Sequence, residues 1–305
     1  FSRVVIITAL ILVQVGLLVF AVWKLSDYFV YWYISCVLLS LAVVIWLMSK
    51  NDNPSYKLAW TILILVLPIF GGLFYLIFGI KRLPLNFKKS MKRVTEDQKR
   101  LLQQNLNVYQ EISGDKGIKK QVHYFHQFAG FPIYKNTTTE YLTPGEMKFE
   151  RMVEELKKAK HYIFMEYFII EEGTMWDTVL DILRKKVQEG VEVRVMYDDI
   201  GCINTLPNRY DAKLRKMGIQ CCVFNPFHAK LNAVFNNRDH RKILVIDGYI
   251  AFTGGINLAD EYINAYPKHG HWKDASIMVK GDAVWSFTIM FLTAWNLTTG
   301  ETCDY

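Results

Sequence analysis

The sequence predicts membrane-spanning helices near the N-terminus, followed by a layered α/β domain with a mixed β-sheet flanked by helices. Two observations lead to this prediction. The chain of 305 residues is 51% hydrophobic, and the apolar excess falls in the first 80 residues. Beyond about residue 122, apolar segments typical of strands alternate with amphipathic segments typical of helices. The 21% of charged residues excludes a chain that lies wholly in a membrane, and the 14% of aromatic residues excludes a disordered one.

The region 1–80 contains three stretches without a charged residue, and each reaches the ~20 residues that a helix needs to cross a bilayer. We predict transmembrane helices at about 4–23, 28–48 and 58–80, because backbone polar groups in lipid must be hydrogen-bonded internally. Pro68 and the glycine pair after it predict a kink or a close helix approach. A signal peptide is the alternative for the first stretch, but its apolar core is long and no A-x-A cleavage site follows.

Residues 81–121 form a polar segment that we interpret as a basic juxtamembrane linker. Between Lys81 and Arg100, eight Lys and Arg stand against two acidic residues, which gives +6 of the chain's total of +7. Positive charge next to an apolar stretch favours anionic phospholipid headgroups over nucleic acid. By the positive-inside rule, we expect a multi-pass protein of the cell membrane whose following domain is cytoplasmic.

The third region, 122–305, alternates between predicted strands and helices, which indicates a parallel or mixed sheet buried on both faces. Strands are predicted at 161–170, 191–199, 219–224, 241–248, 249–255 and 274–281. Helices are predicted at 146–160, 175–190, 208–218 and 283–295, with a further helical stretch in the linker near 95–108. The first of these helices has an apolar stripe of Met147, Met152, Val153, Leu156 and Ala159. The five cysteines have no disulfide or metal-ligand spacing, so we expect free thiols and no zinc. We also expect no other metal and no cofactor.

His240, Lys242 and Asp247 follow the pattern H-x-K-x-x-x-x-D, which suits chemistry on a phosphodiester. On an extended segment, residues two apart face the same side, so His240 and Lys242 would lie together. An imidazole can attack phosphorus while an ammonium beside it holds a phosphate oxygen. His240 is therefore the candidate nucleophile, and Lys242 is the candidate phosphate-binding residue.

A second pattern, G-G-x-N, follows at Gly254, Gly255 and Asn257. Small residues let a phosphate approach the backbone, and the Asn257 amide can donate a hydrogen bond to a phosphate oxygen. The alternative is a strand–turn–strand with incidental polar residues, because H-x-K by itself is common.

The chain contains two further H-x-K sequences that serve as internal comparisons. His228 with Lys230, and His271 with Lys273, lack both the following aspartate and the glycine pair. We do not expect either of them to build a phosphate site.

The segment HRKILVIDGYIAFTGGIN resembles the HKD signature of the phospholipase D superfamily. The apolar stretch YKLAWTILILVLPIFGGLFYLIFG, the basic linker and the segments YIFMEYFIIEEG and VRVMYDDIG are similar to bacterial cardiolipin synthases of that superfamily. The resemblance extends from the second apolar stretch nearly to the end of the chain. It implies an α/β phospholipase D-like fold.

The resemblance also implies a role for each motif residue. The residue matching His240 forms a phosphohistidine intermediate, those matching Lys242 and Asn257 bind phosphate, and the one matching Asp247 chiefly organises the motif. Asp274, on the strand after the motif, is the expected match to a carboxylate that orients the histidine. The alternative is a surface strand residue.

Glu166 is a candidate for the periphery of the site, the alternative being an ordinary carboxylate at a strand end. The family uses two HKD motifs, whereas this sequence contains one. We therefore expect 122–305 to be the first of two halves. The second HKD half would come from a missing C-terminal part or from another chain.

The implied function is that of a membrane-bound phosphatidyltransferase, which makes cardiolipin from two phosphatidylglycerol molecules and releases glycerol. A phospholipase D hydrolase or a phosphatidylserine synthase would use the same motif. A non-catalytic, membrane-anchored lipid-binding scaffold is an alternative of another class. Expected partners are phosphatidylglycerol, other anionic phospholipids and the membrane, with no nucleic acid.

Overall fold

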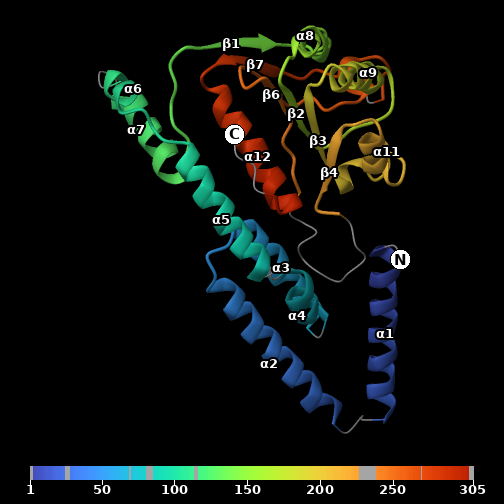
Figure 1. The fold of residues 1–305 in the computed structure, drawn as a ribbon. Coiled ribbons are helices and arrows are strands. Elements are labelled where there is room, and N and C mark those ends of the chain that lie inside the picture. The colour runs from blue at the N-terminus through green and yellow to red at the C-terminus, as the bar shows by residue number, and fades with distance from the viewer. Residues whose placement is uncertain are drawn as a thin grey trace. The chain divides into compact units, whose positions relative to one another are not determined.

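The computed structural model describes residues 3–24, 28–68, 70–79, 85–112, 116–226, 238–268 and 270–301. The chain divides into a helical unit within Phe1–Leu83 and an α/β unit formed by Pro84–Phe227 and Asn237–Tyr305 (Figure 1).

The helical unit contains helices in all three predicted stretches. Its elements are α1 (Arg3–Lys24), α2 (Phe29–Met48), α3 (Pro54–Val66), α4 (Phe70–Phe74) and the π-helical turn η1 (Tyr75–Gly79). Within the described residues, one helical segment, Val30–Met48, is long and apolar enough to cross a membrane, with a mean hydropathy of 2.2 and 11% of it buried. The apolar parts of α1 and α3, Thr8–Phe20 and Pro54–Val66, are shorter.

The third stretch, expected as one helix, is interrupted. Proline has no backbone N–H, so Pro68 cannot continue the helical hydrogen-bond ladder, and α3 ends at Val66. After this break, the backbone of Gly71 lies so close to that of Ile64 that a Cβ on Gly71 would collide with it. A glycine is therefore required where α4 approaches α3, as the sequence pattern predicted.

A small core joins α2, α3 and η1 through Leu47, Ile64 and Tyr75, each at most 1% exposed. Most other large apolar side chains of α2 point outward, among them Leu38 and Leu39, which are 61% and 67% exposed. A helix that is apolar on nearly every side but mostly unburied suits a lipid environment better than a water-facing surface.

The α/β unit is built on one seven-stranded mixed sheet, which confirms the α/β part of the predicted fold. The strand order is β1-β7-β6-β5-β2-β3-β4; β2–β3 and β3–β4 pair in parallel, and the other neighbouring strands pair antiparallel. The strands are β1 (Thr137–Leu142), β2 (Tyr162–Tyr167), β3 (Glu192–Asp198), β4 (Gln220–Phe224), β5 (Ile243–Ile246), β6 (Ile250–Gly254) and β7 (Ser276–Gly281).

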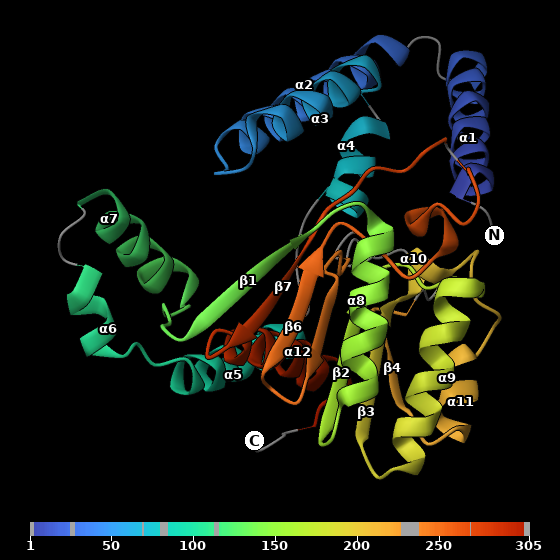
Figure 2. The same ribbon diagram turned by 90° about the horizontal axis from the view of Figure 1, so that it is seen from above.

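Helices cover both faces of this sheet (Figure 2). On one face lie α8 (Gly145–Lys158), α9 (Thr174–Gln188) and α11 (Tyr210–Lys216), which enclose the larger core around Trp176, Leu183 and Phe252. On the other face, α12 (Val284–Thr299) packs on Phe164 and Val245, and α5 (Leu85–Leu101) packs on α12. The remaining helices are α6 (Leu106–Glu111), α7 (Lys116–Tyr124), the π-helical turn η3 (Phe125–Ala129), α10 (Asp199–Cys202) and the 3₁₀ turn η5 (Asp260–Ile263).

The observed elements of the α/β unit differ from the predicted ones in several places. The helical stretch expected near 95–108 is two helices, because α5 ends at Leu101 and α6 begins at Leu106. The edge strand β1 was not predicted, since its sequence TTTEYL is polar and mostly exposed. On α8, Met147 is 49% exposed although the apolar stripe included it, and the neighbouring Lys148 is fully buried instead.

Candidate active site

His240, Lys242 and the G-G-x-N segment gather where the ends of three neighbouring strands meet, at one end of the sheet. β5 runs antiparallel to β2, with Ile243 opposite Glu166, so the start of β5 lies beside the end of β2. The end of β6 also lies beside the start of β5, because Thr253 is opposite Ile243. His240 and Lys242 immediately precede β5, and the G-G-x-N segment begins at the end of β6. The topology therefore brings the two sequence patterns together.

His240 and Lys242 share a neighbour in Phe168, the residue after β2. The ring centroid of Phe168 lies 4.6 Å from the ring centroid of His240 and 5.3 Å from the Nζ of Lys242. His240 is exposed, whereas Lys242 is 3% exposed and donates a hydrogen bond of 2.8 Å to the His240 carbonyl. An accessible imidazole and an ammonium withdrawn from water thus share Phe168 as a neighbour.

A second buried lysine lies at the site, and the sequence analysis missed it. Lys148 of α8 is 0% exposed; its Nζ donates to the Ile256 carbonyl at 3.0 Å and lies 3.5 Å from the Tyr167 hydroxyl. Burial lowers the pKa of Lys148 to about 7 and that of Lys242 to about 8, while Asp274 opposes both shifts. An anion bound here would favour the charged form of both lysines.

Asn257 is held in place by two hydrogen bonds. Its Oδ1 accepts from the Ile169 backbone N–H at 3.0 Å, and its Nδ2 donates to the Tyr262 hydroxyl at 2.8 Å. The amide nitrogen carries a second hydrogen, which is the one that could reach a phosphate oxygen. The side chain is 2% exposed, so its orientation is fixed before any ligand arrives.

The two glycines are required by close packing against the start of β7. A Cβ on Gly255 would collide with the Asp274 carboxylate, and one on Gly254 would collide with the Ala275 carbonyl. These contacts are a packing reason for both glycines, and the predicted approach of a phosphate to their backbone stays a prediction.

Asp274 does not hydrogen-bond His240 in the described part of the chain. Its Oδ2 accepts from Trp272 Nε1 at 3.2 Å, and its Oδ1 accepts from the Ala275 backbone N–H at 2.7 Å. Its charge favours the protonated forms of Lys148 and Lys242. In this geometry, Asp274 balances the buried lysines.

Glu166 lies in a charge cluster with the buried Asp239 and the exposed Arg241, next to the motif. Glu166 is 1% exposed, and its Oε1 lies 2.6 Å from Arg241 Nε, which also donates to Asp239 at 3.1 Å. Burial is the main cause that raises the pKa of Glu166 well above its usual value, and Asp239 adds to it. The Asp239 backbone N–H donates to Asp198 at 3.2 Å. Both residues that flank His240 are thus anchored to the sheet.

Asp247 lies at the other end of β5 from His240, in the turn to β6. Its carboxylate accepts hydrogen bonds from the backbone N–H groups of Lys160, His161 and Tyr162 at 2.7–2.9 Å. It therefore joins the β5–β6 turn to the start of β2. This position suits the organising role that the resemblance implied, and it is too far along the strand for direct contact with the chemistry.

Replacing Asp247 by alanine is expected to lower the free energy of unfolding by about 1–3 kcal/mol, because three N–H groups lose a charged acceptor. Asp247→Asn keeps an acceptor oxygen and tolerates the observed φ of 52°, so it should cost less. Thermal unfolding of the full-length protein in detergent measures both. An Asp247→Ala protein with unchanged unfolding but no turnover would instead assign Asp247 to the chemistry.

The comparison H-x-K sequences differ from the motif. His228 and Lys230 lie outside the described residues. His271 and Lys273 are exposed, and Met278, at the position of the motif aspartate, is buried in β7. Trp272 between them is the residue that donates to Asp274.

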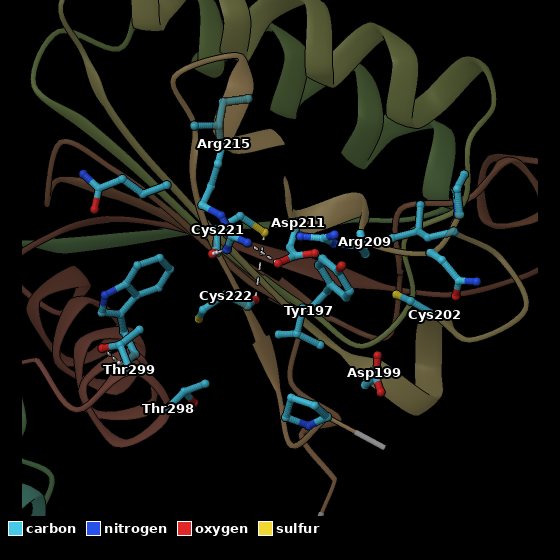
Figure 3. A pocket seen from close by; sticks show the side chains of 18 of the residues that line it. Tyr197, Asp199, Cys202, Arg209, Asp211, Arg215, Cys221, Cys222, Thr298 and Thr299 are labelled. Atoms are coloured by element: carbon cyan, nitrogen blue, oxygen red, sulfur yellow. Dashed lines mark hydrogen bonds and ion pairs between the residues drawn. The ribbon is translucent and has the colours of Figure 1, made fainter. Parts of the chain in front are cut away.

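A hollow of about 990 Å³ lies elsewhere in the α/β unit, along β4. Figure 3 shows its lining, in which Arg215 donates to the Cys221 carbonyl and pairs with Asp211. None of the HKD or G-G-x-N residues lines it. Burial raises the pKa of Cys202 and Cys221 to about 12, so these thiols are protonated and weakly nucleophilic at neutral pH.

The fold and the site together define a class of protein: an α/β domain that presents an accessible histidine beside buried cations suited to a phosphate group. Residues 37–79 match the family model Phospholipase_D-nuclease N-terminal, and residues 152–266 match the model Cardiolipin synthase, PLD-like domain. The chain belongs to the phospholipase D superfamily, and it is similar to bacterial cardiolipin synthases of that superfamily. The resemblance based on the HKD motif is thereby confirmed.

Relatives along most of the chain agree with this assignment. A cardiolipin synthase of Oceanobacillus iheyensis is 35% identical over 88% of the chain, and cardiolipin synthase 1 of Bacillus anthracis is 35% identical over 87%. An uncharacterized protein of Streptococcus mutans is 43% identical over 84%. The chain spans 57%, 52% and 56% of the length of these three relatives, respectively.

Proposed function

We propose that the protein is a membrane-bound phosphatidyltransferase that makes cardiolipin from two phosphatidylglycerol molecules and releases glycerol. The observation that carries this proposal is the exposed His240 beside Lys242, with Asn257 oriented on the neighbouring segment. A nucleophile and fixed phosphate donors are the parts that exchange at a phosphodiester requires. The relatives named cardiolipin synthase support the lipid class.

The reaction proceeds in two displacements at phosphorus. A nitrogen of His240 attacks one phosphatidylglycerol; the P–N bond forms, the bond to the glycerol oxygen breaks, and that oxygen takes a proton from an acid. The headgroup hydroxyl of a second phosphatidylglycerol then gives its proton to the same group and attacks phosphorus. The P–N bond breaks and the imidazole is restored. Lys242 and Asn257 bind the phosphate oxygens throughout.

The acid that protonates the leaving glycerol belongs, in this proposal, to a second HKD half. The sequence contains one complete motif, and the family's chemistry uses two histidines. The second half comes from the remaining part of a longer protein or from a second chain.

Membrane attachment is proposed as multi-pass, with the α/β unit in the cytoplasm. The net +6 between Lys81 and Arg100, next to an apolar stretch, supports this orientation. A reporter active only in the cytoplasm, fused after Arg100, is expected to be active. A silent reporter in a normally expressed fusion would reverse the orientation.

The proposed reaction is tested by its products. Purified full-length protein in vesicles of phosphatidylglycerol is expected to yield cardiolipin and free glycerol in equal amounts. Phosphatidic acid as the main product would identify a hydrolase, and phosphatidylserine formed only on addition of serine would identify a different acceptor. Lipid binding without any product would favour the scaffold.

A further inference from the structure

An amphipathic helical segment, Lys116–Ala129, lies outside the candidate site and has no role in the proposed reaction. It consists of α7 and the π-helical turn η3, which continues it directly. Tyr124, Phe125 and Phe128 lie on one side of the segment; we call these three residues the aromatic face. The rest of the segment carries basic and neutral polar residues, together with the exposed Ile118 and the buried Val122; the basic and polar residues are Lys116, Lys119, Lys120, Gln121, His123, His126 and Gln127.

All three side chains of the aromatic face are exposed. Tyr124, Phe125 and Phe128 are 59%, 55% and 74% exposed. Their rings contact one another, with Tyr124 5.0 Å from Phe128 and 6.1 Å from Phe125 between centroids. Three contiguous exposed aromatic rings form an apolar patch of the kind that marks an interaction surface rather than a single exposed residue.

The charge of the segment indicates which partner fits that patch. Lys116–Ala129 contains three lysines and no acidic residue, and all three lysines are exposed. A helix with aromatic residues on one side and lysines on the other suits the boundary between headgroups and acyl chains of an anionic bilayer. Aromatic rings prefer that depth, and lysines next to it attract anionic headgroups.

We infer that Lys116–Ala129 lies in the interface of an anionic phospholipid membrane, with the aromatic face inserted and the lysines at the headgroups. The inference rests on the proposed membrane association, but it does not require turnover. It gives the α/β unit a membrane contact of its own, separate from the apolar helices of Phe1–Leu83. The function of such a contact is to hold the catalytic domain at the surface where its lipid substrates lie.

The experiment places an environment-sensitive fluorophore at position 128. In full-length protein with all native cysteines replaced by serine, Phe128→Cys is labelled and reconstituted into phosphatidylglycerol-containing vesicles with or without spin-labelled lipid. Tyr249→Cys is the matched control, because Tyr249 is an aromatic residue that is 61% exposed in the β5–β6 turn of the same unit. The label at 128 is expected to emit at shorter wavelength and to lose at least half of its intensity to the spin-labelled lipid, whereas the label at 249 should do neither.

Other results would overturn the inference. A label at 128 that is as water-exposed and unquenched as the one at 249 would show that the segment stays in solution. A blue shift without lipid quenching would show that a protein surface, such as a second copy, covers the aromatic face. Exchanging Lys116, Lys119 and Lys120 for glutamate should reduce the quenching several-fold, and unchanged quenching would remove the electrostatic part of the argument. His240→Ala in the labelled protein should leave the quenching unchanged, which separates this inference from the proposed reaction.

Discussion

Replacing His240 by alanine in the intact protein is expected to reduce cardiolipin synthesis by about 10⁴-fold or more, because the nucleophile is lost and the two-step exchange has no covalent intermediate. His240 is exposed and forms no element of the core, so the variant should fold normally. The initial rate of product formation from phosphatidylglycerol vesicles measures the effect.

The matched control is His271→Ala, since His271 is also an exposed histidine with a lysine two residues later. It should keep most of the activity, as should His228→Ala. Equal losses in His240→Ala and His271→Ala would show that the HKD pattern does not select the nucleophile.

Replacing Lys242 by methionine is expected to lower turnover by about 10²–10³-fold, the usual effect of removing one preorganised donor to a developing charge. Folding should be retained, because Lys242 is 3% exposed and methionine fills a similar volume without a buried charge. Lys273→Met, at an exposed position, is the control. Near-normal turnover in Lys242→Met would exclude Lys242 as a phosphate ligand.

The pH dependence gives a second readout of the same residue. Burial lowers the pKa of Lys242 to about 8, so the free enzyme carries this charge below pH 8 and loses it as the pH rises further. Catalytic efficiency of the wild type is therefore expected to fall above about pH 8. The residual activity of Lys242→Met should lack that decrease.

Much of the fold could be predicted because its strands are short apolar runs closed by turn residues. β2, β3 and β5 fall within the predicted ranges, and their burial on both faces follows from a sheet covered by helices on each side. The edge strand β1 has no such signal, since TTTEYL is held by pairing with β7 rather than by its own hydrophobicity. Pro68 and the glycines after it predicted a kink, but the sequence did not indicate that α3 would end just before Pro68.

The positions of site residues could be predicted where the local sequence pattern determines them. They could not be predicted where contacts between distant parts of the chain determine them. His240 and Lys242 lie two residues apart on an extended segment, so their shared contact with Phe168 follows from local spacing. Lys148 reads as a surface lysine in an amphipathic helix. Its burial is possible because its ammonium donates a hydrogen bond to the Ile256 carbonyl, more than 100 residues away in the chain. The periodicity of the helix does not indicate this long-range contact.

The central claim is that His240 carries the phosphatidyl group between the two lipids. The most direct measurement is acid-quenched incubation of the full-length protein with phosphatidyl-labelled substrate, followed by peptide analysis of the trapped label. The account predicts acid-labile label on the peptide that contains His240, and none in His240→Ala. Label on another residue, or synthesis at a normal rate by the His240→Ala protein, would contradict it.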